Sequence, residues 1–400
     1  MLAGRRIVLG VTGGIAAYKA IELCRRLVDA GAHVSPVLTD GALRFVGATT
    51  FSALASEPVQ TSLWDEDSPI PHTRLGQGAD LILVAPATAR LISDLRTGRS
   101  HDLLTATLLA TRAPVVLCPA MHTEMWEHPA VQDNLAVLAD RGVHLVPPEE
   151  GRLAGGDVGA GRLADPATIV AHAERVLGPG DLAGTSVLVT AGGTREPIDP
   201  VRFIGNRSSG KQGIALAREA WARGADVTLV STVAADVVAA IEVVRVDTAA
   251  EMHAAVTTRA PSADIVVMAA AVADFRPATA ATAKLKKHQG VPEVVLEPTV
   301  DILAELGGAK PAGQVLVGFA AETHDVVAHA RDKLARKGAD LIVANDVSAP
   351  GVGFEHDTNA VVVVGADGVD HTVPLSDKRA VARAVLDAAV ARRPSSPGAP

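Results

Sequence analysis

The feature that most constrains the fold is a plan that the chain uses twice. An apolar strand ends in a glycine turn, a helix follows, and a second strand begins after a Gly-Ala pair. The first copy has its strand at 7–11 and its glycines at 13–14, and the second has them at 187–190 and 192–193. Units of this kind build parallel sheets. The repetition therefore predicts two α/β domains.

Three later segments favour the same arrangement. Residues 79–85, 263–268 and 339–344 are apolar runs introduced by Ala-Asp, which suits strands that helices cover on both faces. We predict two doubly wound, Rossmann-like α/β domains with mainly parallel sheets and ligands at the carboxyl ends of the strands. Glycine and proline residues around position 179 interrupt regular structure and place the boundary between a domain of residues 1–178 and one of residues 181–400. The tail at 393–400 is expected to be disordered.

Composition argues against several classes of protein. The 400 residues are 48% hydrophobic and 20% charged, which suits sizeable cores, and the net charge of −8 argues against nucleic-acid binding. No run of about eighteen apolar residues and no signal-peptide pattern occur, so we expect a cytoplasmic protein without a membrane partner. Cys24 and Cys118 are too few for a disulfide framework and suit a reducing compartment.

The segment 190–213 is the most informative stretch for function. Gly192 and Gly193 permit a tight turn after the strand, and a helix is expected to start within 208–217, where free N–H groups favour phosphate or carboxylate. Arg195, Arg202 and Lys211 add positive charge. An ordinary loop with solvated basic residues is the alternative when the glycines and charges are taken alone.

This segment resembles the signature of the phosphopantothenate–cysteine ligase family. Four further stretches match the family pattern in order, at 270–275, 284–287, 318–323 and 344–348. The resemblance covers about residues 184–390. It implies a ligase that uses CTP to activate the carboxylate of 4'-phosphopantothenate as an acyl cytidylate with release of pyrophosphate. The amine of cysteine then attacks the activated carbonyl and CMP is released.

The resemblance also implies roles for individual residues. Asn206 matches the residue that binds the acyl-cytidylate carbonyl, and Arg202 serves the same substrate site. Asp274 is expected to accept from the cytosine amino group, and Lys284 is assigned to the triphosphate, although the run at 284–288 alternatively reads as a solvated charged stretch. The matching CTP positions are Ala270, Asp274, Lys284, Phe319, Lys333 and Lys337. Mg²⁺ is expected to be held mainly by phosphate oxygens, and its protein ligands are unknown.

The glycine turn of the N-terminal half predicts a mononucleotide site. Residues 10–14 lack the Gly-x-Gly-x-x-Gly spacing of dinucleotide sites but precede a helix start. Residues 10–19, 85–89, 101–104 and 119–126 resemble the motifs of the flavin-containing cysteine decarboxylase family, over about residues 5–165. That resemblance implies FMN at positions matching Gly13, Gly14, Ile15, Thr39, Thr88, Ser100, Asp102 and Leu103.

The implied reaction of this half is the decarboxylation of phosphopantothenoylcysteine to 4'-phosphopantetheine. With FMN supplying the redox chemistry, the cysteine side chain is oxidised to a thioaldehyde, carbon dioxide leaves, and the electrons are returned. His72 matches the active-site histidine of the family, and an imidazole near neutral pH can assist proton removal. Taken alone, one histidine among 13 is more often a surface or core residue.

Two positions depart from the family pattern. Where the family has Pro-x-Met-Asn, this chain has Met121 followed by His122, so an imidazole stands where an amide contacts the substrate carboxylate. The alternative is that His122 only fills the pocket. The clamp cysteine, which protonates the enethiol intermediate in the family, is replaced by Gly155. Cys118 is expected in the core, so the proton comes from water or His122, or the reaction stops at the enethiol.

Together the two resemblances predict a bifunctional enzyme of coenzyme A biosynthesis that ligates first and decarboxylates second. The alternatives are an active ligase with an impaired decarboxylase half, and a flavin-binding regulatory or scaffold module. The expected partners are small molecules, namely 4'-phosphopantothenate, cysteine, CTP and phosphopantothenoylcysteine. The resemblances also imply a homo-oligomer, with trimers of the flavin domain and dimers of the ligase domain combining up to a dodecamer.

Overall fold

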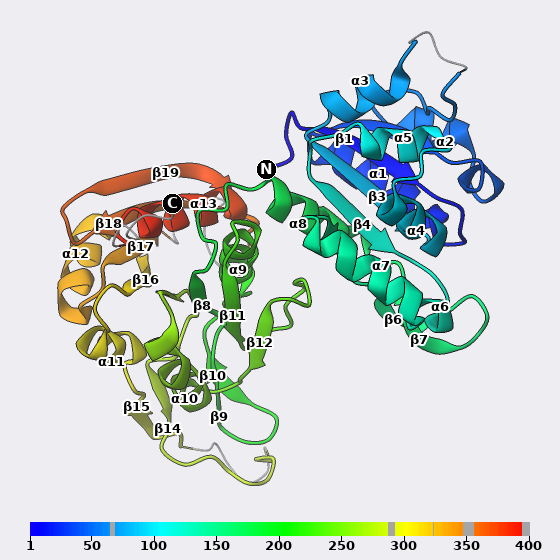
Figure 1. Cartoon of the computed structure of the whole chain (residues 1–400). Coiled ribbons are helices and arrows are strands. Elements are labelled where there is room, and N and C mark those ends of the chain that lie inside the picture. The colour runs from blue at the N-terminus through cyan, green and yellow to red at the C-terminus, as the bar shows by residue number, and fades with distance from the viewer. Residues whose placement is uncertain (65–68, 287–292, 323, 347–355, 394–400) are drawn as a thin grey trace. The chain divides into compact units, whose positions relative to one another are not determined.

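The computed structural model describes residues 1–64, 69–286, 293–322, 324–346 and 356–393. The chain forms two compact units, Met1–Gly178 and Pro179–Pro400, each with its own sheet. Both are α/β structures with mainly parallel strands (Figure 1), so the predicted fold class is confirmed. The tail predicted to be disordered lies outside the described residues from 394 onward.

The first unit is built on a parallel sheet of five strands in the order β2-β1-β3-β4-β5. Its helices and strands alternate along the chain, and a hairpin of β6 and β7 precedes the last helix. The strands are β1 (Arg6–Val11), β2 (His33–Leu38), β3 (Leu81–Ala87), β4 (Val115–Pro119), β5 (His144–Leu145), β6 (Glu149–Arg152) and β7 (Val158–Arg162). The helices are α1 (Ala17–Asp29), α2 (Ala48–Leu54), α3 (Pro71–Gly78), α4 (Ala89–Thr97), α5 (Leu103–Leu109), α6 (Thr123–Trp126), α7 (Pro129–Asp140) and α8 (Pro166–Leu177).

Helices cover both faces of this sheet, which explains why β3 is apolar throughout. Leu81 and Leu83 belong to a core cluster that includes side chains of α1 and α8. Ile82 and Val84 belong to a second cluster that includes side chains of α4, α5 and α7. All seven residues of β3 are buried, as expected of a central parallel strand.

The second unit has a sheet of eight strands in the order β12-β11-β8-β13-β16-β17-β18-β19. The first six are parallel, whereas β18 and β19 run antiparallel to their neighbours. The strands are β8 (Ser186–Ala191), β11 (Asp226–Ser231), β12 (Glu242–Arg245), β13 (Ile265–Met268), β16 (Val315–Glu322), β17 (Leu341–Asp346), β18 (Thr358–Gly365) and β19 (Asp370–Asp377). Two hairpins outside the sheet pair β9 (Arg195–Pro197) with β10 (Phe203–Gly205) and β14 (Phe275–Pro277) with β15 (Leu296–Pro298).

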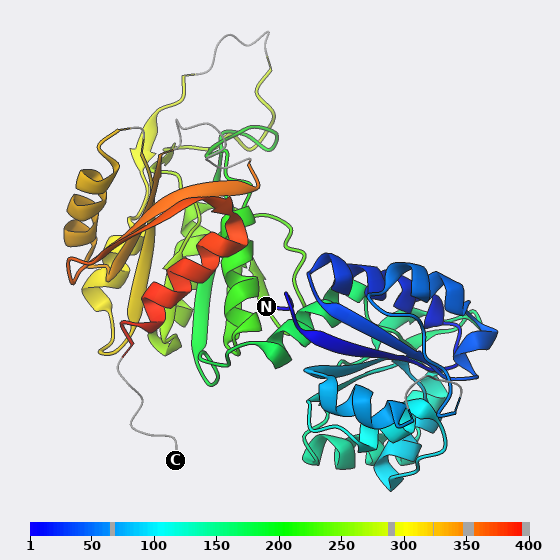
Figure 2. The ribbon, with the colours of Figure 1, turned by 90° about the horizontal axis from the view of Figure 1, so that it is seen from above.

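The helices of the second unit are α9 (Lys211–Ala222), α10 (Ala249–Arg259), α11 (Ile302–Ala309), α12 (Val326–Lys337) and α13 (Lys378–Val390). Figure 2 shows α9 and α13 side by side, and ion pairs join them. Glu219 of α9 is buried, and its two carboxylate oxygens accept from Arg379 at 2.8 Å and Arg383 at 3.2 Å, both on α13. These contacts fix the start of α13 relative to α9.

The strand orders place one crevice in each unit. In the first sheet β1 lies between β2 and β3, and the connections of the chain run outward from β1 in both directions. In the second sheet β8 lies in the same way between β11 and β13. Open α/β sheets bind ligands outside the carboxyl ends of the strands at such a point. The segments that follow β1, β3, β8 and β13 are therefore the places to examine for function.

Candidate functional sites

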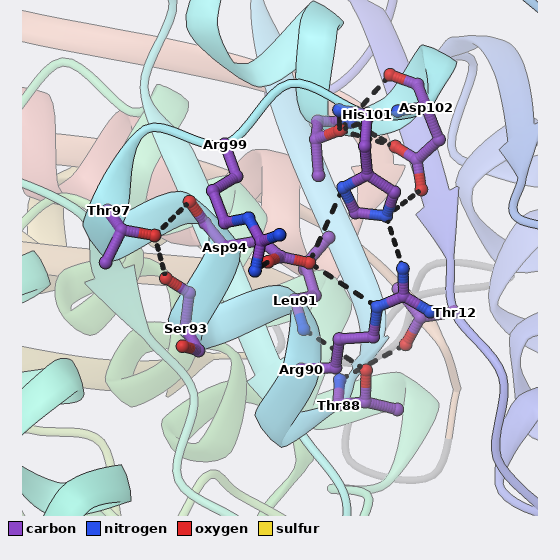
Figure 3. A network of polar contacts seen from close by, with 11 residues as sticks. Thr12, Thr88, Arg90, Leu91, Ser93, Asp94, Thr97, Arg99, His101 and Asp102 are labelled. Carbon is purple, nitrogen blue, oxygen red and sulfur yellow. Dashed lines mark hydrogen bonds and ion pairs between the residues drawn. The ribbon is translucent and has the colours of Figure 1, made fainter.

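Threonine hydroxyls organise the crevice of the first unit. Thr12, which follows β1, donates to the carbonyl of Pro86 at 2.7 Å and accepts from the backbone N–H of Thr88 at 3.1 Å. The Thr88 hydroxyl in turn accepts from the N–H of Leu91 at 3.5 Å, at the start of α4. Figure 3 shows Thr12 and Thr88 facing each other. The ends of β1 and β3 and the first turn of α4 are thus held together.

The glycine turn leaves room beside these threonines. A Cβ on Gly13 would lie 2.7 to 2.9 Å from the backbone of Gly41, so glycine permits the turn to approach the loop that begins at Thr39. A Cβ on Gly14 would meet only Thr88 Cγ2, at 4.0 Å. Ile15 is 60% exposed beside them. The predicted positions Gly13, Gly14, Thr39 and Thr88 therefore lie close together at the carboxyl ends of β1, β2 and β3, a region that we call the mouth. Helix starts at such a place suit a phosphate-bearing ligand.

The other predicted cofactor positions lie on the turn into α5. Asp102 caps this helix, accepting from the N–H of Thr105 at 2.8 Å, while its own N–H donates to the Thr105 hydroxyl at 3.1 Å. Ser100 is exposed, and Leu103 is buried in the core. Leu103 can therefore offer a ligand only its backbone.

A charged network on α4 was not predicted from the sequence. Asp94 is 4% exposed and lies 3.6 Å from Arg90 and 3.8 Å from Arg99. Arg90 donates to Nε2 of His101 at 2.7 Å, while Nδ1 of that ring lies 3.7 Å from Asp94 (Figure 3). These residues and Ser93 line a pocket of about 340 Å³. Asp94 offsets only one of the two arginines, so Arg90, Arg99 and Asp94 together keep one net positive charge.

His72 carries an unsatisfied ring nitrogen. It lies in the first turn of α3, directly after Pro71. Its Nδ1 is buried and has no hydrogen-bond partner among the residues that the structure describes. A buried polar atom without a partner is rare in folded proteins. The ring therefore has an unused hydrogen-bonding position, and the role predicted for His72 stays a prediction.

His122 lies between two carboxylates. Its Nδ1 contacts Glu124 at 2.8 Å, and its Nε2 lies 3.7 Å from Asp157, in the turn of the β6–β7 hairpin. The hydrogen bond from His122 lowers the pKa of Glu124. Met121 donates its backbone N–H to Gly161 of the same hairpin at 3.0 Å. Cys118 is completely buried in β4, and burial raises the pKa of its thiol.

The crevice of the second unit is a pocket of about 590 Å³. Six of the predicted ligase residues line it, at the ends of β13 and β16 and on the segments around them: Asn206, Ala270, Asp274, Phe319, Lys333 and Lys337. The side-chain amide of Asn206 donates to the carbonyls of Ala271 at 3.3 Å and Val272 at 3.2 Å. The segment that follows β10 is thereby joined to the segment that follows β13.

Two lysines of this pocket have perturbed environments. The ammonium group of Lys333 donates to the Phe319 carbonyl at 2.8 Å. Burial lowers the pKa of Lys333, and the negative charges of Glu322 and Asp274 oppose that shift. Lys378 is 7% exposed at the start of α13, and burial together with the charge of Lys211 lowers its pKa. Lys337 pairs with Asp301. The pocket thus concentrates positive charge in a partly dry site, which suits a polyanion.

Some lining residues were not assigned roles from the sequence. Residues 208–213, at the start of α9, line the pocket. Gly210 caps this helix with φ +76°, and Lys211 forms an ion pair with Asp357 at 2.6 Å. This stretch lies within the predicted anion-binding segment, so its sequence did carry a signal. Asn345, Asn359 and Lys378 come from β17, β18 and α13, and no local motif in β18 or α13 marked the latter two.

Arg202 and Lys284 lie outside this lining. Arg202 contacts the carboxylate of Asp199 at 2.9 Å and the carbonyl of Leu285, whose N–H donates to the same carboxylate at 3.1 Å. Arg202 therefore holds the segment that carries Lys284 against the β9–β10 loop. Lys284 is exposed, and residues 287–288 of the basic run lie outside the described part of the chain.

Within the described ranges of the chain, neither a metal centre nor a membrane span is found. Across the described residues, no group of three or more His, Cys, Asp and Glu side chains could hold a metal ion. In the same part of the chain no helix has the length and apolar character needed to cross a membrane.

Comparisons with known proteins follow the division into two units. Residues 1–178 match the family model described as Flavoprotein, and residues 182–392 match the DNA/pantothenate metabolism flavoprotein C-terminal domain. The coenzyme A biosynthesis bifunctional protein CoaBC of Mycobacterium tuberculosis is 51% identical and the one of Bacillus subtilis is 47% identical. The alignments cover 96% of this chain in both cases, and 96% and 97% of those proteins.

Solved structures match each half. A crystal structure of the C-terminal domain of CoaBC is 40% identical, with a TM-score of 0.44, and covers 52% of this chain and 95% of that one. The FMN-dependent cysteine decarboxylase SpaF is 30% identical, with a TM-score of 0.39, and covers 43% of this chain and 99% of that one.

Proposed function

The chain belongs to the family of coenzyme A biosynthesis bifunctional proteins, and we propose that its two activities are divided between its two units. It is an enzyme with ligase and decarboxylase activities, and the alternatives of an impaired or purely regulatory flavin half are not favoured. In the proposed division, residues 1–178 decarboxylate phosphopantothenoylcysteine and residues 181–400 ligate 4'-phosphopantothenate with cysteine.

The first unit is proposed to hold FMN at the mouth between β1 and β3. When bound, the flavin accepts and returns the electrons that make decarboxylation of the cysteine-derived group possible. Gly13, Gly14 and Ile15 would flank its phosphate, with Thr39, Thr88 and the 100–103 turn around it. The open space beside Gly14 and the unused hydrogen-bonding position at Nδ1 of His72 support this assignment.

Within that site His72 is proposed to move a proton at the substrate. Its unpartnered Nδ1 can accept a hydrogen bond, and the position of the ring after Pro71 is fixed by the first turn of α3. His122, with Met121, is proposed to contact the substrate carboxylate that is lost. An imidazole N–H can donate to a carboxylate as the amide of an asparagine would.

The second unit is proposed to bind CTP along its lysine-lined pocket. Lys333 and Lys337 would neutralise the triphosphate together with Lys284, and Mg²⁺ would be held mainly by phosphate oxygens. Asp274 would accept from the cytosine amino group, with Ala270 and Phe319 packing near the nucleotide. Asn206 would donate to the carbonyl of the acyl cytidylate, and Arg202 would serve the same substrate.

Exposed apolar side chains support a homo-oligomer. On the two hairpins of the second unit, Phe203 is 55% exposed and Phe275 is 54% exposed, and Leu296 and Val201 lie open near them. We propose that these hairpins pair two ligase units and that the flavin units form trimers. The assembly would then extend up to a dodecamer.

The single observation that carries the division of labour is the pair of crevices, one at the switch point of each sheet. Purified full-length protein is expected to contain FMN and to convert phosphopantothenate, cysteine and CTP to phosphopantetheine. Gly13→Ala places a methyl group against the Gly41 backbone and is expected to remove FMN and carbon dioxide release while ligation continues. Loss of ligation in this variant, or FMN retained at the parental level, would contradict the proposed division. Gly98→Ala, at a glycine with open surroundings but φ +72°, controls for general destabilisation.

A further inference from the structure

The turn of the β6–β7 hairpin is shaped around His122. Gly155 has no positive φ that would require glycine, yet a Cβ there would lie 2.9 Å from Nε2 of His122 and 3.3 Å from the carboxylate of Asp157. Side chains rarely approach that closely, so any residue larger than glycine would displace the imidazole or the turn. Glycine at 155 therefore preserves the position of one ring nitrogen.

The hairpin is docked on both sides of the ring. The N–H of Met121 donates to the Gly161 carbonyl at 3.0 Å, and the hydroxyl of Thr123 donates to the Ala160 carbonyl at 2.9 Å. A side chain at Gly161 would run into the Met121 carbonyl. The backbone before and after His122 is thus tied to β7, so the ring and the 153–157 turn keep a fixed relation.

Both nitrogens of the ring face carboxylates. Glu124 of α6 accepts at Nδ1 at 2.8 Å, and Asp157 of the turn stands 3.7 Å from Nε2. While Nδ1 donates to Glu124, Nε2 can give up a proton only from a ring that carries a proton on each nitrogen. The side chain is 40% exposed, so solvent can restore a proton that the ring gives up. The Asp157 side chain is 67% exposed, so it can move aside and leave Nε2 of His122 to a substrate.

We infer that His122 delivers the proton that completes the reductive half of the decarboxylase reaction, an inference that rests on the proposed function of this unit. After carbon dioxide leaves, the product carries a carbon–carbon double bond next to sulfur. The carbon that bore the carboxylate gains the proton from Nε2, and the electron pair of the double bond forms this new C–H bond. The sulfur-bearing carbon gains a hydride, which the reduced flavin of the established reaction supplies. The ring is left neutral and regains its proton from water.

The test is the ratio of saturated thiol to enethiol among decarboxylated products, measured by mass spectrometry on the FMN-loaded full-length protein. His122→Asn retains an amide donor for the carboxylate but removes the transferable proton. We expect the enethiol fraction to rise at least tenfold relative to the parent. Carbon dioxide release is measured separately and reports on substrate binding. Because the ratio of thiol to enethiol counts only decarboxylated products, the rate of carbon dioxide release does not enter it.

The outcomes separate this inference from the proposed function. A fall in carbon dioxide release with an unchanged product ratio would overturn the inference and leave His122 as a substrate-binding residue. An unchanged ratio at an unchanged rate would overturn it as well. A parent protein that releases no carbon dioxide would remove the proposed function of the unit and this inference together.

A second measurement needs no activity. In protein without flavin, labelled histidine rings can be followed by NMR, with the His122 resonance assigned from the His122→Asn variant. We expect Gly155→Ala and Asp157→Asn to shift that resonance, because they disturb the contacts at Nε2. Val158→Ala, on an exposed side chain of the same hairpin, and Glu150→Gln, an exposed carboxylate on β6, are matched controls expected to leave it unchanged. A resonance that Gly155→Ala and Asp157→Asn both leave in place would contradict the close packing on which the inference depends.

Discussion

The two crevices occupy the same point of the fold but are lined by different groups. In the first unit, threonine hydroxyls and glycines flank the mouth, and Asp94 offsets one of the two nearby arginines, Arg90 and Arg99. In the second, four lysines and two aspartates line one pocket: Lys211, Lys333, Lys337, Lys378, Asp274 and Asp301. The fold supplies the location, and the side chains then adapt it to ligands of different charge.

The difference matches the chemistry proposed for each unit. A flavin mononucleotide carries a single phosphate, which a tight turn and helix starts can satisfy with neutral donors. A nucleoside triphosphate carries several charges and leaves as pyrophosphate and monophosphate, so it needs cations that offset charge during the reaction. The comparison therefore predicts that substitutions in one crevice leave the chemistry of the other unchanged.

The largest effect is expected for His72→Asn. Removing a proton-transfer group is expected to lower carbon dioxide release by about two to four orders of magnitude. Ligation, followed as pyrophosphate release from CTP in the same preparation, is expected to continue at the parental rate, because the other unit is untouched. FMN absorbance checks that the site still binds its cofactor. Parental carbon dioxide release in the variant would show that His72 is a packing residue.

For Asn206→Asp we expect the reverse result, in which ligation is impaired and decarboxylation is retained. This change puts an anion beside an acyl phosphate ester and removes a donor, which together are expected to cost on the order of 3 kcal/mol or more, about a hundredfold in ligation. CTP binding is expected to persist, as is decarboxylation of added phosphopantothenoylcysteine. Pyrophosphate and CMP release are measured separately. CMP release at the parental rate would place the acyl-cytidylate site elsewhere. Lys284→Gln is expected to impair the earlier, pyrophosphate-releasing step.

A smaller effect concerns pH and Lys333. Burial lowers the pKa of this lysine, so its ammonium form is lost at a lower alkaline pH than that of an exposed lysine. CTP affinity is therefore expected to fall as the pH rises through that lowered pKa, whereas Lys333→Arg, which stays charged, postpones the loss. Lys333→Met is expected to weaken CTP binding about tenfold at neutral pH. Titration calorimetry across pH measures this, with Arg331→Gln, at an exposed arginine of α12, as the control. Identical pH profiles for the parent and Lys333→Arg would contradict it.

The lowered pKa of Lys333 affects folding stability in the opposite direction to CTP binding. Because folding disfavours the charged form of Lys333, the lysine opposes folding at neutral pH, and that penalty is relieved as the pH rises through the lowered pKa. Lys333→Met is therefore not expected to lower the free energy of unfolding at neutral pH. A variant that unfolds more readily than the parent would indicate that the contact with the Phe319 carbonyl outweighs burial of the charge.

Local sequence accounts for much of the fold and for part of each site. Continuous apolar runs predicted β3, β13 and β17, and the glycine turn after β1 predicted where α1 begins, because these signals depend on neighbouring residues. The start of α9 was predicted within 208–217, but the β9–β10 hairpin between β8 and α9 was not predicted. The apolar run at 360–364 marks β18 but says nothing of its antiparallel partner, and Asn359 and Lys378 reach the pocket only through the fold, so they were not assigned to it. The contact of Gly155 with His122 joins residues more than thirty positions apart in the sequence, and only the packed hairpin reveals it.

The smallest effect is expected for Cys118→Ser. Cys118 is completely buried in β4 and burial raises the pKa of its thiol, so it has no contact with solvent that would renew a donated proton. Serine buries a hydroxyl in place of sulfur, which is expected to cost about 1 to 2 kcal/mol of stability. The ratio of thiol to enethiol is expected to stay parental. Cys24→Ser, at the other buried cysteine of the same unit, is the matched control for the loss of stability. Enethiol that accumulates in Cys118→Ser but not in Cys24→Ser would identify Cys118 as the proton source and would remove that role from His122.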